Sequence, residues 1–415
     1  MKRFIYYILI VVVASSLSSC LKDIKDSDLF DGAKEIVVDV SLPEALASES
    51  KEGFCVTLRN IKTGASYVLK TNAEGEASIE AEYGSYTILV SKDIEVDGVI
   101  KYLRSTQNII LSKDSAGPQK ATAEIKVSNK GTIILKEAYF QKSKTPANAN
   151  YIYDQYFSLY NNSDKVQYLD GIGLGFTNQT TSAATGWYVK DWIEGSVEPR
   201  DSVPLYPIGF VFPGKGQEYP MEPGEEVVVA FSAINHTAAM TTTPIDLSAD
   251  NVWAMYSDDL KGQKVPAPGV KRMEKYCKYG TATMVVVGQL NAACVLYRIE
   301  GDPVEYVAEG PVQGRPFGNV MFKPTAYTSS PAIMIPKEWV YDGVEFRNNA
   351  THVARLCPEI SLQPMTISTA AYTGISYIRK VDETATAAAG HTVYQDTNDS
   401  SQDWMMIDKP TLCTK

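Results

Sequence analysis

Short runs of alternating apolar and polar residues, separated by turn-forming residues, recur along most of this chain. In the N-terminal part such runs lie at 35–42, 53–59, 66–70, 77–81 and 85–90. Alternation over four to eight residues predicts half-buried β-strands. The turns 62–64 and 72–75 each end in a glycine, where a hairpin needs positive φ. We therefore expect an antiparallel β-sandwich over residues 33–128.

The same pattern continues after the polar turn 128–131. Strand candidates lie at 132–140, 151–160, 167–171, 226–231, 252–256, 284–288, 293–299, 320–322 and 332–335. No convincing long amphipathic helix interrupts them, and Pro-Gly pairs separate them. Residues 129–415 are therefore expected to form a second β-sandwich, so the predicted fold class is all-β.

The segment 154–175, DQYFSLYNNSDKVQYLDGIGLG, organises this second unit. It is typical of a strand, a tight connection and a second strand. Tyr156 and Tyr160 fall on one face of the first strand, and Phe157 and Leu159 fall on the other. Because both faces are apolar, we expect this strand to be buried between layers.

The first twenty residues form a targeting segment. Lys2 and Arg3 precede an apolar run, 4–14, that is too short to span a bilayer. The run ends in Leu17-Ser18-Ser19-Cys20, which resembles the lipobox of bacterial lipoproteins. This resemblance implies a signal peptide at 1–19 and a lipid-anchored Cys20. The alternative is an ordinary cleaved signal with an incidental cysteine.

An acid-rich stretch follows the lipobox. LKDIKDSDLFDG mixes four aspartates with two lysines, which is typical of a flexible tether over residues 20–32. It also resembles the surface-export signal of Bacteroidetes-type lipoproteins. We therefore expect a protein on the outer membrane, exposed at the cell surface, with the periplasmic face as the alternative.

Composition limits the function classes. The chain has 415 residues, 44% hydrophobic and 21% charged, which is enough for two or three globular domains. Its formal net charge of −10 argues against nucleic acid as a partner, because phosphate backbones need Lys/Arg stripes. No cofactor is expected.

Five cysteines follow Cys20, and none of them forms a C-x-x-C motif. An odd number leaves at least one unpaired. In an oxidising envelope Cys277–Cys294 and Cys357–Cys413 are candidate disulfides, although four cysteines permit three connectivities.

Two parts of the chain resemble known β-domains. VTLRNIKTGASYVLKTNAEGEASIEAEYGSYTILV resembles the carboxypeptidase regulatory-like, transthyretin-type sandwich. QYFSLYNNSDKVQYLDGIGL resembles the first hairpin of the lamin-tail type of immunoglobulin-like sandwich. MEPGEEVVVAF, GISYIRK and DTNDSSQDWMM resemble its later strands and closing turn. Residues 246–363 are a long insertion relative to that compact form.

The whole arrangement resembles a lipoprotein family of Bacteroides-type bacteria known as domain of unknown function 4876. Such proteins combine a lipobox, a small regulatory-like sandwich and this C-terminal region. The resemblance implies a location and an architecture, and no reaction.

Each candidate ligand-binding motif also has a purely structural interpretation. The glycines at 171, 173 and 175 superficially resemble a nucleotide-binding loop, but the spacing is wrong and no helix pattern follows. Asp396, Asn398, Asp399 and Asp403 could bind calcium through oxygen ligands. We favour a turn role for these four residues, because Asp and Asn side chains bond neighbouring backbone amides.

Aromatic residues are the strongest candidates for a ligand-binding surface. Trp187, Tyr188 and Trp192 lie in a polar, glycine-containing segment, and Tyr206, Phe210 and Phe212 follow in a Pro/Gly-rich one. Such rings either form a platform for sugars or peptides on sandwich loops or fill the core. The second role is the commoner one.

Asp114-Ser115-Ala116 and Asp201-Ser202-Val203 resemble the acceptor motif of Bacteroides-type envelope O-glycosylation. Short motifs of this kind also recur by chance.

The sequence therefore predicts a non-enzymatic binding or assembly role. The resemblance to Bacteroides-type lipoproteins, and no particular residue, implies that this role is accessory to an outer-membrane uptake transporter. The partners would be an outer-membrane barrel protein or a glycan or peptide ligand. A surface hydrolase is one alternative, although the three histidines, His236, His352 and His391, share no ligand spacing and no G-x-S-x-G motif is present. A purely structural or adhesin subunit is the other.

Overall fold

The computed structural model describes most of the chain after residue 31. The described residues are 32–63, 65–96, 99–113, 117–129, 132–177, 202–239, 243–308, 319–321, 332–349, 354–357 and 360–413. They form two compact units. Residues up to 90 and 107–125 belong to the first unit, and residues 91–106 and 126 onward belong to the second. The expected boundary after residue 128 lies close to residue 126, but the second unit also includes 91–106.

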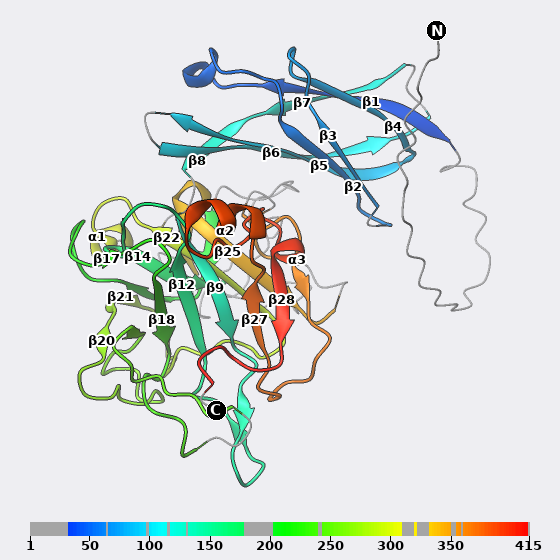
Figure 1. The fold of residues 1–415 in the computed structure, drawn as a ribbon. Coiled ribbons are helices and arrows are strands. Elements are labelled where there is room, and N and C mark those ends of the chain that lie inside the picture. The colour runs from blue at the N-terminus through cyan, green and yellow to red at the C-terminus, as the bar shows by residue number, and fades with distance from the viewer. Residues whose placement is uncertain are drawn as a thin grey trace, which may run out of the picture. The chain divides into compact units, whose positions relative to one another are not determined.

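The first unit is built from two sheets (Figure 1). In one sheet β1 (Ala33–Ser41) lies between an antiparallel β4 (Glu76–Glu82) and a parallel β7 (Gln119–Glu124). The other sheet has the order β3 (Ser66–Lys70), β2 (Cys55–Asn60), β5 (Gly84–Val96), β6 (Val99–Leu111) and β8 (Lys126–Asn129). This sheet continues into the second unit, to which β8 and the residues of β5 and β6 within 91–106 belong. Alternate residues are buried, as Ile36, Val38 and Val40 of β1 are, so each sheet has one apolar face.

The second unit is a sandwich of two large sheets. The first has the order β20 (Lys271–Arg272), β19 (Val252–Ala254), β18 (Glu226–Ala230), β12 (Tyr156–Asn161), β9 (Ile133–Tyr139), β27 (Ser376–Arg379) and β28 (Trp404–Ile407). The facing sheet has the order β21 (Glu274–Lys278), β16 (Ile208–Val211), β14 (Ile172–Phe176), β22 (Ala292–Arg298), β25 (Val340–Arg347) and β26 (Met365–Thr366).

Smaller elements complete the second unit. A three-stranded sheet, β15 (Ser202–Leu205), β24 (Ala332–Pro336) and β23 (Val320–Met321), adds a further layer. Two short pairs are β10 (Ser143–Lys144) with β11 (Asn150–Tyr151), and β13 (Gln167–Tyr168) with β17 (Pro220–Met221). The helices are short: η1 (Glu44–Leu46) in the first unit, and α1 (Pro303–Val307), η3 (Lys337–Trp339), α2 (Glu383–Ala389) and α3 (Ser400–Asp403) in the second. Among the described residues no helix has the length and apolarity to cross a bilayer.

Strand β12 lies in the middle of the seven-stranded sheet, and all six of its residues are buried. Phe157 and Leu159 point into the core between the two large sheets, while Tyr156 joins a separate cluster on the opposite side. The expectation of a strand buried on both faces is therefore confirmed.

The predicted hairpin at 154–175 is wrong. Strand β12 pairs with β9 and β18, whereas β14 pairs with β16 and β22 of the facing sheet. The connection between them contains β13 and is long enough to pass from one sheet to the other. Two strands that are apolar on both faces can each occupy the middle of a sheet, so local pattern did not specify their pairing.

The predicted strand at 284–288 is wrong, because this segment pairs with no described strand. Its backbone N–H groups bond instead to side-chain amides: Val285 donates to Gln263 Oε1, and Val287 donates to Gln155 Oε1. An apolar run can thus satisfy its backbone without joining a sheet.

The candidate disulfides are not formed, because all five described cysteines are thiols. Cys277 lies on β21 and Cys294 on β22, and β16 and β14 separate these strands. At about 4.8 Å per strand, the two residues are too far apart for a disulfide. Cys357 belongs to the core beneath the three-stranded sheet, whereas Cys413 pairs with Ile245 in a different core region.

The core between the two large sheets should carry most of the stability of the second unit. Phe157 is fully buried there and contacts Phe140, Phe176 and Phe231. Phe157→Ala should lower the free energy of unfolding by about 3–5 kcal/mol in a denaturant titration. Val265→Ala, at a residue that is 64% exposed, is the control and should change it by less than about 0.5 kcal/mol. Equal effects of the two substitutions would contradict this assignment of the core.

Candidate functional site

The described residues test only some of the predicted site residues. Cys20, Ser115, Trp187, Tyr188 and Trp192 lie outside them, as does His352. Ser202 is half-buried at the start of β15, where it pairs with Pro336.

The aromatic-platform interpretation is wrong for Phe210 and Phe212. Both are buried in the core between the large sheets, and Phe212 makes an edge contact with Trp253 at 5.1 Å. Tyr206 is half-buried against the same core, and this burial raises the pKa of its hydroxyl. These rings stabilise the fold instead of presenting a surface.

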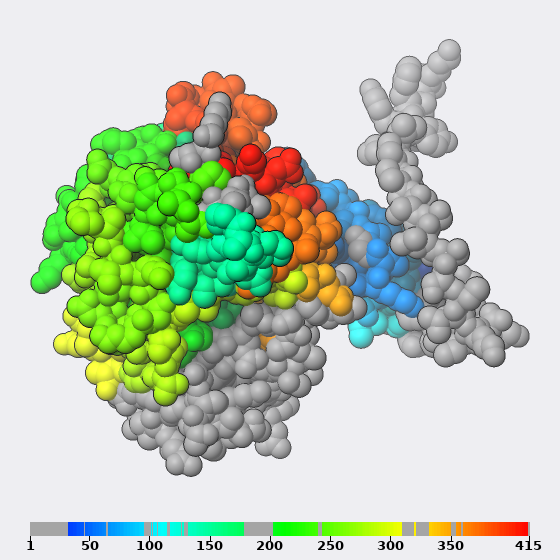
Figure 2. All heavy atoms as spheres, turned by 90° about the horizontal axis from the view of Figure 1, so that it is seen from below, coloured from blue at the N-terminus to red at the C-terminus, as the bar shows by residue number. Residues whose placement is uncertain are grey.

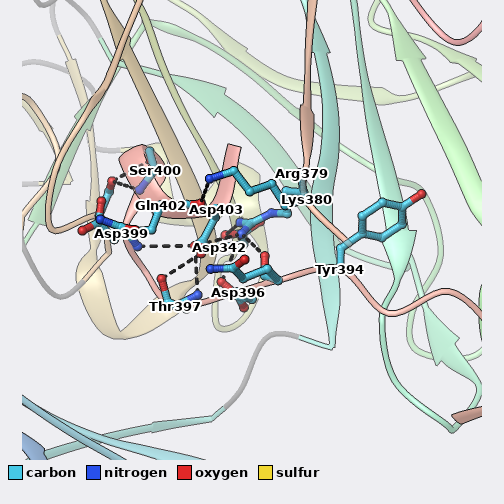
Figure 3. Close-up of polar contacts among 12 residues, drawn as sticks. Asp342, Arg379, Lys380, Tyr394, Asp396, Thr397, Asp399, Ser400, Gln402 and Asp403 are labelled. Carbon is cyan, nitrogen blue, oxygen red and sulfur yellow. Dashed lines mark hydrogen bonds and ion pairs between the residues drawn. The ribbon is translucent and has the colours of Figure 1, made fainter. Parts of the chain in front are cut away.

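A buried charged cluster is the most distinctive polar feature of the second unit. It consists of Arg379 with the carboxylates of Asp342, Asp396 and Asp403, and we call it the Arg379 cluster (Figure 3). The guanidinium lies 2.5 Å from Asp342 Oδ1 and 3.3 Å from each of the other two carboxylates. All four side chains are at most 4% exposed.

The cluster lies where a β-bulge interrupts the pairing of β9. Opposite Ser158 and Leu159 of β12, the register of β9 skips Lys136. On the other side of β9, strand β27 pairs with Glu137 and Ala138 only. The backbone of Leu135 therefore bonds to side chains.

Two members of the cluster form hydrogen bonds with the backbone of Leu135. Arg379 Nε donates to the carbonyl oxygen of Leu135 at 2.7 Å, and the N–H of Leu135 donates to Asp342 Oδ2 at 2.6 Å. Because Arg379 ends β27 and Asp342 lies on β25 of the facing sheet, these bonds link the two large sheets. An unpaired buried backbone group would otherwise be costly.

The third carboxylate, Asp403, organises the closing turn. Its Oδ2 accepts hydrogen bonds from the backbone N–H of Thr397 and from Arg379. The neighbouring Asp399 caps α3 by accepting from Ser401 N–H at 3.0 Å, and Asn398 adopts the left-handed conformation with φ 57°. These contacts match the favoured interpretation of the Asp/Asn pattern, in which the side chains bond to neighbouring backbone amides of a turn.

Burial dominates the electrostatics of the cluster. It raises the pKa of Asp342 and of Asp403, each to about 6, although the nearby guanidinium acts in the opposite direction. The three carboxylates in turn raise the pKa of Arg379 further above its usual range. One buried cation thus faces three acids, which leaves an excess of negative charge when all are ionised.

The calcium interpretation gains no support. Within the described part of the chain, no group of three His, Cys, Asp or Glu side chains has an arrangement suited to a metal ion. Asp396 and Asp403 bond to a guanidinium, and Asp399 bonds to backbone and hydroxyl groups of its own turn.

A second buried acid lies at the end of the β9–β12 pair. Asp154 Oδ2 accepts from Tyr139 Oη at 2.7 Å and from Ser143 Oγ at 2.8 Å, and burial raises its pKa to about 6. Burial also lowers the pKa of the nearby Lys142 to about 8. The hairpin that follows contacts distant segments: the carbonyl oxygen of Lys142 accepts from Gly374 N–H, and Lys264 Nζ lies 4.6 Å from the centre of the Tyr153 ring. Figure 2 shows teal atoms of this part of the chain beside yellow-green and orange atoms of later segments.

The two described histidines, His236 and His391, lie in different environments. His236 is fully buried, with Nδ1 at 2.7 Å from Tyr151 Oη and Nε2 at 2.9 Å from the carbonyl oxygen of Ser232. Burial lowers the pKa of His236, so the ring is neutral at physiological pH. His391 is half-buried beside Gly224. Neither histidine contacts an acid or nucleophile in a catalytic arrangement among the described residues.

Sequence reasoning identified Asp396 and Asp403 but missed Arg379 and Asp342. Arg379 is one charged residue in a short apolar strand, Ser376–Arg379, which is the only local signal that it carries. Its partners are separated from it by 37 residues at Asp342 and by 244 residues at Leu135. The chemistry available to the assembled cluster is ion pairing and proton binding inside the fold.

The C-terminal half of the chain carries a known family pattern. Residues 222–411 match the family model described as "Protein of unknown function (DUF4876)". The matched region includes Asp342, Arg379 and Asp403. No curated protein matches the chain.

A solved structure shows a similar fold. The chain is similar to a DUF4876 family protein from Bacteroides thetaiotaomicron, with 21% identity and a TM-score of 0.57, over 92% of this chain and 96% of the other. A candidate adhesin from Bacteroides ovatus aligns over 63% of this chain and 99% of the other, with 9% identity and a TM-score of 0.19. The second similarity is too low to support an argument.

The Arg379 cluster should be essential for the stability of the second unit. Asp342→Ala removes the carboxylate nearest to the guanidinium and leaves the Leu135 N–H without its buried acceptor, so it should lower the free energy of unfolding by about 3–5 kcal/mol. The control is Asp259→Ala, which removes a half-exposed carboxylate 2.7 Å from Lys275 and should cost at most about 1 kcal/mol. Chemical denaturation measures both, and a loss for Asp342→Ala no larger than that for Asp259→Ala would refute the role of the cluster.

Proposed function

We propose that this protein is a lipoprotein of the outer membrane, anchored through Cys20 and exposed at the cell surface, with a non-enzymatic binding or assembly role. The observation that carries the anchor is the order of the first twenty residues: Lys2 and Arg3, a short apolar run, and Leu17-Ser18-Ser19-Cys20. A diacylglyceryl group on this thiol, with a further acyl chain on the new N-terminus, gives stable attachment.

The chemistry of the second unit is consistent with a scaffold. In the Arg379 cluster the acids with perturbed pKa values bond to a guanidinium and to backbone groups at the centre of the fold. Perturbed acids in an enzyme would instead be expected to face a cleft that admits substrate. The clustering of ionisable groups therefore favours rigidity over a reaction.

At the level of fold, we infer that the first unit is of the carboxypeptidase regulatory-like, transthyretin type and the second of the lamin-tail, immunoglobulin-like type. Two sheets with one apolar face each support the first assignment. The two facing sheets and the polar turn at 396–403 support the second. The first unit would then act as a spacer that lifts the second away from the membrane.

The binding role would be that of an accessory to an outer-membrane uptake transporter, with a barrel protein as the partner and a glycan or peptide as the ligand. This proposal predicts that affinity purification from cross-linked envelopes recovers a barrel protein with the wild-type chain. The control is the unanchored Cys20→Ser chain, which should recover much less. Recovery of only soluble proteins in repeated experiments would contradict the transporter link, and hydrolysis of a glycan or peptide by the pure protein would favour the hydrolase alternative.

Removal of the anchor should release the protein from the membrane. Cys20→Ser should abolish labelling by radioactive palmitate and move the protein from the membrane fraction to the soluble fraction, because the thiol is the site of lipid attachment. Cys55→Ser, at a half-buried thiol of β2, is the matched control and should leave labelling unchanged.

The comparison of Cys20→Ser with Cys55→Ser tests whether Cys20 carries the lipid anchor. Continued membrane association of the Cys20→Ser chain, with palmitate still incorporated, would contradict the lipobox interpretation. Protease treatment of intact cells tests surface exposure separately: a surface protein is degraded, and a periplasmic one is protected.

A further inference from the structure

The Arg379 cluster contains more acid than base, and its hydrogen bonds differ in whether they allow a proton to be added. Asp342, Asp396 and Asp403 face one guanidinium in a buried setting. Protonation of one carboxyl would reduce the excess negative charge. The question is which oxygen can receive the proton without facing another donor.

Both oxygens of Asp342 already accept from N–H donors. Oδ1 accepts from Arg379 at 2.5 Å and from Gly343 N–H at 2.7 Å, and Oδ2 accepts from Leu135 N–H at 2.6 Å. A backbone N–H or a guanidinium cannot reverse its role. A proton on either oxygen would therefore be directed at a donor, so the hydrogen bonds of Asp342 oppose its protonation even though burial raises its pKa.

Asp403 differs at one oxygen. Its Oδ2 accepts from Thr397 N–H at 2.9 Å and from Arg379 at 3.3 Å. Within the described chain, the hydrogen-bond partner of Oδ1 is the hydroxyl of Thr397, at 2.7 Å. A hydroxyl can donate or accept, and Thr397 is exposed, so its own proton can turn toward solvent.

We propose that Asp403 Oδ1 is the protonation site of the Arg379 cluster, and that proton uptake there stabilises the second unit against unfolding at mildly acidic pH. On protonation, Asp403 Oδ1–H donates to Thr397 Oγ1, while Oδ2 keeps its bonds to Thr397 N–H and Arg379. The Arg379–Asp342 pair and both bonds to Leu135 are unchanged. Thr397 supplies the route by which the proton exchanges with solvent.

The charged and titratable groups around this carboxyl come from every neighbouring element. They are Arg379 of β27, Asp342 of β25, Asp396 and Asp399 of the turn, and Lys380, whose Nζ bonds to the carbonyl oxygen of Gln402. Cys294 of β22 lies near Asp342 and Arg379. Arg379 opposes proton uptake, and burial and Asp396 favour it.

The sign of the pH dependence follows from linkage. The pKa of Asp403 is raised from an ordinary 3.8 to about 6, so between these values the folded chain holds a proton that the unfolded chain has released. Stability from this group therefore increases as the pH falls from about 7 to about 4, and it is lost as the pH rises through 6. Asp154 and Glu345, whose pKa values burial raises to about 6 and about 7, act in the same direction elsewhere in the fold.

The substitution Asp403→Asn separates this site from those groups. An asparagine can place its amide group at the Oδ1 position, donating to Thr397, and its carbonyl oxygen at the Oδ2 position, so it imitates the protonated acid. Asp342→Asn is the matched control, because an amide at either oxygen would face an N–H donor. Asp396→Asn tests the remaining carboxylate of the cluster.

The experiment measures Tm against pH for the full mature chain and these three variants. We expect Asp403→Asn to equal the wild type at pH 5 and to exceed it by about 2–4 °C at pH 7.5. Asp342→Asn should be less stable than the wild type at both pH values. Asp396→Asn should reduce the difference between the two pH values without abolishing it, because the charge of Asp396 favours proton uptake by Asp403.

Three outcomes would overturn the proposal. They are an unchanged pH dependence in Asp403→Asn, loss of that dependence in Asp396→Asn instead, and failure of Asp403→Asn to fold at either pH. The last would show that the charge of Asp403 is required for its hydrogen bonds.

Discussion

The fold of the second unit depends on the hydrogen bonds that the backbone of one interrupted strand forms with side chains. Strand β9 runs beside β12 in the middle of the seven-stranded sheet, and its bulge at Lys136 leaves the backbone of Leu135 bonded to side chains. The guanidinium that accomplishes this is buried with three carboxylates. Removal of four charges from water is costly, so the arrangement persists only because each charge has partners in good geometry. The same contacts fix β25 against β9 and thereby set the two large sheets relative to each other.

The remainder of the unit follows from that constraint. Phe140, Phe157, Phe346 and Tyr377 pack as neighbouring rings between the sheets, and Trp404 contacts both Phe346 and the Arg379 guanidinium. Aromatic packing and the charged cluster are thus one continuous core. The closing turn at 396–403, which sits over this core, is held by the same Asp403 that reaches Arg379.

Much of the strand content could be predicted from the sequence, because alternation and turn chemistry are local. The burial of β12 on both faces followed from Tyr156 and Phe157 pointing in opposite directions along an apolar strand. Its pairing did not follow, because β12 and β14 are both apolar enough for a sheet interior and only their partners decide between a hairpin and a crossover. Of the two roles open to Phe210 and Phe212, the surface platform was wrong and the commoner role of filling the core was correct. Phe210 lies on β16 and Phe212 directly follows it, and residues two apart in extended chain share one face.

The Arg379 cluster lay beyond sequence reasoning for a different reason. Asp403 belongs to a recognisable Asp/Asn turn, but Asp342 and Leu135 join it from strands that are distant in the chain. A charge in an apolar strand, as at Arg379, indicates a buried partner without identifying it. The family match over 222–411 and the fold shared with a Bacteroides protein add an architecture and leave the ligand to experiment.

The most direct test of the central claim is a double-mutant cycle between Asp342 and Arg379, measured by chemical denaturation of Asp342→Leu, Arg379→Leu and the double variant. If the pair links the sheets as described, Asp342→Leu removes the nearest partner of the guanidinium, and Arg379→Leu leaves three buried carboxylates without their cation. The loss in the double variant should then be smaller than the sum of the two single losses, with a coupling energy of about 2–3 kcal/mol. Losses that simply add, with coupling below about 0.5 kcal/mol, would contradict the account.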